Sequence, residues 1–84
     1  MQPVPTAATP KVAIVLNRAK LDELRQAHNI PTEAELARRI GVTPETLWRV
    51  SRGETYPSNA FMARVRLAFP AASLDSLFSV REVA

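Results

Sequence analysis

The chain has 84 residues, of which 46% are hydrophobic, and it carries a formal net charge of +3 with no cysteine. This length fits one small domain, which buries only about 60% of the surface that its unfolded chain exposes. The composition excludes disulfides, zinc fingers and thiol catalysis, suits a reducing cytoplasm, and contains no apolar run near the roughly 20 residues of a membrane span.

The N-terminal region divides into an arm, a strand and a helix. Residues 1–10 contain three prolines, which disfavour a helix and predict a flexible arm. Lys11–Leu16 is apolar and rich in β-branched residues, which favours a short strand. Asn17 can then cap a helix over residues 18–28, with its leucines facing inward. The alternative starts this helix near Lys11 and leaves the C-terminal tail unpaired.

Residues 32–53 (TEAELARRIGVTPETLWRVSRG) form the most informative stretch. Thr32 followed by Glu35 is a capping box, so a helix should begin at Glu33. The apolar positions of this helix share one stripe: Leu36, Ala37 and Ile40. Gly41 follows the stripe, at the place where a residue with positive φ commonly ends a helix.

A second short helix is expected within residues 43–52. Thr43 is its N-cap, and Pro44 takes the first helical position, where its missing N–H costs nothing. Leu47 and Val50 carry the inward stripe of this helix. Two short helices joined by a tight turn form the helix-turn-helix pattern, whose second helix enters the DNA major groove. The pattern therefore indicates a DNA-binding regulator.

At about 100° per residue, one outward face of this second helix collects four large side chains. They are Glu45, Trp48, Arg49 and Arg52. Arg49 can fork onto guanine O6 and N7, and Glu45 either accepts from a cytosine amino group or pairs with Arg49. Trp48 either contacts a thymine methyl group or a sugar, or it packs against the domain or a second subunit.

The C-terminal third predicts one more full helix, a helical turn and a strand. Ser58 is the N-cap of a helix that Pro70 stops. Its apolar positions are Phe61, Met62, Val65, Ala68 and Phe69. Ser73 starts a last helical turn with three inward positions: Leu74, Leu77 and Phe78. The tail at residues 79–83 alternates as a strand does and is expected to pair with residues 11–16. The expected fold class is mainly α, with this small two-stranded sheet as an addition.

Several short motifs also occur in a familiar order and spacing. They are Leu24-Arg25, Glu35-Leu36-Ala37, Gly41-Val42-Thr43, Thr46-Leu47, Arg49-Val50, Arg52-Gly53, Pro57-Ser58 and the run from Ser73 to Phe78. From Leu21 to Phe78, about two-thirds of the sequence, the chain thereby resembles the lambda-repressor-like, Cro-type (XRE) regulators, most closely small ones from actinobacteria and their phages. The resemblance implies a five-helix helix-turn-helix domain over residues 11–84 that binds operator DNA, usually as a homodimer.

The resemblance also implies roles for individual residues. Pro44, Glu45 and Arg49 match positions that face the bases. The positions expected to contact phosphate are Thr43, Arg52, Ser58 and Asn59, with Arg39 on a solvated flank near the DNA. The chain departs from the family's pattern at Glu33, where a glutamine that approaches phosphate is frequent. It departs again at Ser51, where a glutamate is common, so a structural hydrogen bond is expected to be missing there.

The sequence thus predicts a cytoplasmic, sequence-specific transcriptional regulator of the phage or prophage Cro or repressor type. The alternative is a protein-interaction module, antitoxin-like or antirepressor-like, anchored by Trp48. An enzyme is not expected, because the chain has one histidine and no glycine-rich phosphate loop. We expect no cofactor, metal, membrane or small-molecule substrate. The arm is either a disordered tail or a segment that contacts the minor groove. The sequence does not decide whether the dimer forms through the last helix, through the tail strand or only by pairing on DNA.

Overall fold

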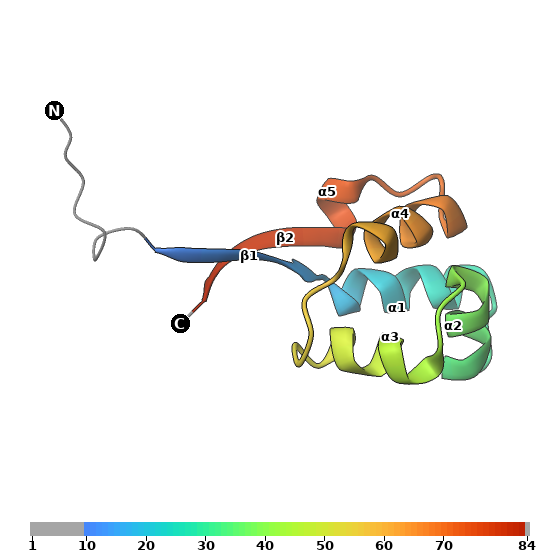
Figure 1. Ribbon diagram of the computed structural model, residues 1–84. Coiled ribbons are helices and arrows are strands. Elements are labelled where there is room, and N and C mark those ends of the chain that lie inside the picture. The colour runs from blue at the N-terminus through green and yellow to red at the C-terminus, as the bar shows by residue number, and fades with distance from the viewer. Residues whose placement is uncertain (1–9, 84) are drawn as a thin grey trace, which may run out of the picture.

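A computed structural model describes residues 10–83, so the arm expected for residues 1–10 lies almost wholly outside the described residues. Within this range the chain is mainly helical, with five helices and a two-stranded antiparallel sheet (Figure 1). The elements are β1 (Lys11–Leu16), α1 (Arg18–Ala27), α2 (Glu33–Ile40), α3 (Pro44–Ser51), α4 (Asn59–Ala68), α5 (Leu74–Leu77) and β2 (Phe78–Val83). This architecture confirms the expected fold class.

The two terminal strands pair with each other. Leu16 lies opposite Phe78 at the base of this ribbon, and Lys11 lies opposite Val83 at its tip. The pairing predicted from the sequence is confirmed, and the alternative of a helix from Lys11 with an unpaired tail is wrong. β2 begins one residue earlier than expected because Phe78 already belongs to the strand. The ribbon projects from one end of the helical body (Figure 1).

A side chain caps the N-terminus of each helix in residues 10–83. In every case the capping oxygen accepts a hydrogen bond from the backbone N–H three residues later. The caps are Asn17, Thr32, Thr43, Ser58 and Ser73. Each such cap contributes on the order of 1 kcal/mol, so the helix starts are fixed largely by local sequence.

In residues 10–83, three residues with positive φ follow helix ends: Asn29 after α1, Gly41 after α2 and Gly53 after α3. Gly41 ends α2 with φ 93°, and its N–H donates to the carbonyl of Ala37. Because few other residues adopt this positive φ without strain, the turn between α2 and α3 favours glycine. Asn29, with φ 56°, reverses the chain after α1, a conformation that asparagine tolerates.

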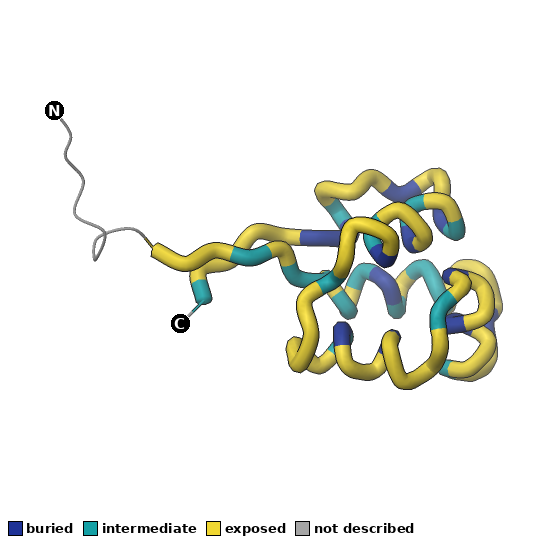
Figure 2. The backbone as a smooth tube through the Cα atoms, viewed as in Figure 1, coloured by how far each residue is buried: buried dark blue, intermediate teal, exposed yellow. Residues whose placement is uncertain are grey.

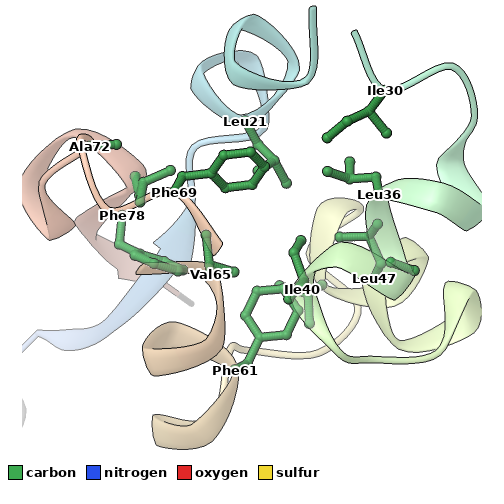
Figure 3. Close-up of a cluster of buried hydrophobic side chains, with 13 residues drawn as sticks. Leu21, Ile30, Leu36, Ile40, Leu47, Phe61, Val65, Phe69, Ala72 and Phe78 are labelled. Carbon is green, nitrogen blue, oxygen red and sulfur yellow. The ribbon is translucent and has the colours of Figure 1, made fainter. Parts of the chain in front are cut away.

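One hydrophobic core joins the helices to the base of the ribbon (Figure 3). Its most deeply buried large side chains are Phe69, Leu21, Leu36, Leu47, Leu77 and Val65. Phe61 and Phe78 meet edge to face with ring centroids 6.5 Å apart, which ties α4 to β2. The expected burial of Leu74 is wrong, since 48% of it is exposed. The single turn of α5 packs through its C-terminal end, and its first residue lies at the edge of the core.

Among residues 10–83 the longest helices have ten residues, and none is long and apolar enough to cross a membrane.

Candidate nucleic-acid interface

The core fixes the orientation of α3. Leu47 is fully buried and Val50 is 6% exposed, so the inner side of this eight-residue helix is sealed against the domain. Thr43 and Pro44 occupy the N-cap and the first helical turn, as the sequence predicted. The opposite side of α3 can therefore only face outward.

The outer face of α3 consists of four residues on two successive turns: Glu45, Trp48, Arg49 and Arg52. Each of the four is more than half exposed. The values are 71% for the Glu45 side chain, 55% for Arg49, 54% for Arg52 and 53% for Trp48. The structure thus brings together the four side chains that helical angles placed on one face. An indole this exposed is unusual, because it leaves a large apolar area in water.

These four residues make only weak contacts with one another and with the following loop. Arg49 Nη2 lies 2.9 Å from Oε2 of Glu45, which confirms that this pair forms in the free protein. The Arg52 guanidinium lies 5.2 Å from the ring centroid of Trp48, and its Nη1 lies 3.3 Å from Oε2 of Glu54. Exposed pairs of this kind contribute about 0.2–1 kcal/mol each. A ligand that offers acceptors to the arginines can replace them at little cost.

A second arginine cluster lies inside the helical unit, and sequence reasoning missed it. Arg18, the first residue of α1, donates to both carboxylate oxygens of Glu33 at 2.6 and 2.8 Å and to Ser51 Oγ at 2.9 Å. Its Nε donates to Oδ1 of Asp22 at 3.0 Å. We call these four residues the Arg18 junction. It ties the start of α1 to the start of α2 and the end of α3.

The Arg18 junction corrects the expectation for Ser51. The hydrogen bond expected to be missing at that position is made, because Arg18 donates to the serine hydroxyl. Glu33 is turned toward Arg18, and its Oε1 also lies 3.6 Å from Nη1 of Arg25. Its carboxylate therefore pairs with two arginines of α1. Hydrogen bonding to Glu33 raises the pKa of the Arg18 guanidinium above its ordinary value, so Arg18 keeps its positive charge.

The residues expected to contact phosphate are spread over three helices. Thr43 Oγ1 accepts from the N–H of Thr46 and donates to its hydroxyl at 2.9 Å, so capping already uses this side chain. Ser58 caps α4 in the same way, and Asn59 is exposed at the first position of that helix. These positions are helix N-termini, which attract anions through their unpaired N–H groups.

Arg39 lies apart from the outer face of α3. It is exposed in the last turn of α2, and its Nη2 lies 3.5 Å from Nδ1 of His28. His28 is the C-cap of α1, and its ring packs edge to face against the Phe69 ring, with the ring centroids 5.1 Å apart. Arg39 is therefore oriented toward the end of α1, and its assignment to phosphate stays a prediction.

No group of three or more histidine, aspartate or glutamate side chains in residues 10–83 is placed to hold a metal ion. No family model, curated protein or solved structure matches this chain. The functional assignment therefore depends on the residues of α2 and α3 and on their geometry.

Proposed function

We propose that this chain is a sequence-specific, DNA-binding transcriptional regulator of the lambda-repressor-like, Cro type, acting in the cytoplasm as a dimer on operator DNA. The observation that carries the proposal is the outer face of α3. This helix is sealed on one side by Leu47 and Val50, while its other side presents two arginines, a carboxylate and an indole to solvent. The short helix and tight turn that precede it support the same assignment.

In the proposed complex the first two turns of α3 read base edges. Arg49 leaves Glu45 and forks onto guanine O6 and N7, an exchange that an exposed ion pair permits at little cost. Glu45 either accepts from a cytosine amino group or continues to orient Arg49. Pro44, exposed at the start of the helix, and Trp48 offer apolar surface to a thymine methyl group or a sugar.

Phosphate contacts supply most of the affinity in this proposal. Arg52 at the end of α3 and Thr43 at its start flank the base-reading residues, and Ser58 with Asn59 begins α4. Binding to phosphates releases counterions from DNA, so the affinity depends steeply on salt.

Salt dependence tests this proposal. Genomic DNA fragments from the source organism are selected for binding to the full chain. The bound sequence within the selected fragments is then located by footprinting. We expect its affinity to fall about 1,000-fold between 50 and 200 mM salt, as befits several phosphate contacts in each subunit. A chain that selects no fragment, or that binds DNA with no salt dependence, would contradict the proposal.

A protein-interaction module on the same fold is the second candidate, because Trp48 and Tyr56 are 53% and 52% exposed. Exposed aromatic side chains are frequent anchors of protein interfaces. Indifference to duplex DNA in the selection above favours this candidate.

A further inference from the structure

The ribbon formed by β1 and β2 has one apolar side, which continues from the hydrophobic core to a region beyond the helices. Directly opposed residues of an antiparallel pair share a face, and so do alternate residues along each strand. The pairs Leu16–Phe78, Ile14–Val80 and Val12–Glu82 therefore lie on the same side of the ribbon. At the base this side is covered, since Phe78 is 7% exposed and packs on Phe61 of α4.

Farther out the same side is uncovered. Val12 is 60% exposed, Ile14 41% and Val80 72%. We call these three side chains the apolar ribbon face. Figure 2 shows the contrast along β2, which is buried where it leaves the helices and exposed over most of its length. Glu82 lies on the same side, opposite Val12 and one pair from the tip.

A two-stranded sheet without a covering layer is marginally stable in water, because it buries too little apolar surface. The outer part of the ribbon receives no such layer from residues 10–83. The ribbon leaves one end of the helical body and prolongs it (Figure 1). A partner with an equally narrow apolar strip fits this face better than a globular surface does.

We propose that the apolar ribbon face binds the same face of a second copy of this chain, with the two ribbons stacked in opposite directions about a two-fold axis. Val80 and Ile14, the pair near the middle of the ribbon, lie at the centre of this contact. The tip of each ribbon then approaches the base of the other, so the two helical bodies lie at opposite ends of the stacked ribbons.

The expected spacing of the two α3 helices favours a second copy as the occupant. The ribbon leaves the end of the body where α1 begins and α3 ends, and it runs in roughly the same direction as α3 (Figure 1). A six-residue strand spans about 20 Å and an eight-residue helix about 12 Å, so fully overlapped ribbons place the centres of the two α3 helices about 32 Å apart. Half-sites one turn apart on DNA need roughly 34 Å. This spacing argument rests on the proposed function, whereas the ribbon contact itself can be measured without DNA.

The test is the oligomeric state of the full chain by sedimentation over a range of concentrations, without DNA. We expect a wild-type dimer, and Val80→Lys should weaken it at least about tenfold, because each dimer then buries two lysines against apolar partners. Leu67→Lys is the matched control, since Leu67 is 78% exposed on α4, and it should leave the dimer unchanged. Circular dichroism verifies folding, and Val80→Thr, which keeps the shape of the side chain, should weaken the dimer in the same direction.

Cross-linking locates the contact. The chain has no cysteine, so Val80→Cys introduces a single thiol near the expected two-fold axis, and mild oxidation should join two copies. Leu67→Cys should form no disulfide-linked dimer under the same conditions, because Leu67 lies on α4 and not on the ribbon. A wild-type chain that stays monomeric at every concentration, or a dimer that Val80→Lys leaves intact, overturns the ribbon contact. An operator-bound dimer that Val80→Lys leaves intact would overturn the contact alone, and a ribbon dimer indifferent to DNA would overturn the proposed function alone.

Discussion

The Arg18 junction and the outer face of α3 contain the same chemistry in opposite settings. Both pair arginines with carboxylates. The Arg18 side chain is 23% exposed and contacts two further helices, whereas the Arg49 side chain is 55% exposed and contacts one residue of its own helix. One arginine connects elements that are distant in sequence, and the other makes a local pair.

This difference distinguishes an arginine that holds helices together from an arginine that is free to contact a ligand. Moving Arg18 away from Glu33 and Ser51 would loosen the attachment of α3 to α1 and α2, so these contacts hold the three helices together. Moving Arg49 away from Glu45 breaks one exposed pair worth about 0.3–0.5 kcal/mol and leaves the helix in place. The packing of the three helices can thus stay unchanged while the outer face of α3 exchanges its own contacts for contacts with a ligand.

The largest expected effect comes from the core that supports both regions. Leu47→Ala removes a fully buried side chain from the inner side of α3 and should lower the free energy of unfolding by about 3 kcal/mol. Leu67→Ala makes the same change at a residue that is 78% exposed and should cost less than about 0.5 kcal/mol. Denaturant titration measures both variants. Similar losses from the two would mean that Leu47 does not anchor α3.

A smaller effect should distinguish the two arginine sites from each other. Arg18→Ala leaves Glu33 and Ser51 without their shared donor and should lower the free energy of unfolding by about 1–2 kcal/mol. Arg49→Ala should lower it by less than about 0.5 kcal/mol. Arg18→Lys keeps the charge and loses the forked geometry, so it should fall between wild type and Arg18→Ala. If Arg49→Ala destabilises the chain as much as Arg18→Ala does, the contrast between the two regions is wrong.

Much of the fold could be predicted because the residues that start and end its helices act locally. Thr32, Thr43 and Ser58 each cap a helix through an N–H three residues away, and Gly41 adopts the positive φ that its position suggested. The outer face of α3 followed from helical angles alone, since its members lie within eight residues of one another. The strand pairing needed only two β-patterned segments at the ends of the described chain.

The parts that could not be predicted depend on contacts between distant residues. Arg18 meets Glu33 and Ser51, which lie 15 and 33 positions away, and nothing in its neighbourhood except Asp22 indicates a partner. Leu74 fits an inward position by its spacing, and only the placement of α5 at the edge of the core exposes it. The stack of Arg52 on Trp48 is four residues apart and could have been found from spacing.

The most direct test of the central claim compares wild type and Arg49→Ala on the selected operator and on an unrelated duplex, at one salt concentration. We expect the preference for the operator to fall by about 10- to 100-fold, corresponding to the 1–3 kcal/mol of one bidentate arginine–guanine contact, with affinity for the unrelated duplex nearly unchanged. Arg81→Ala removes the same charge from the ribbon, on the side opposite the apolar ribbon face, and should leave the preference intact. Equal loss on both duplexes, or no loss on either, would contradict the account of α3 as the helix that reads bases.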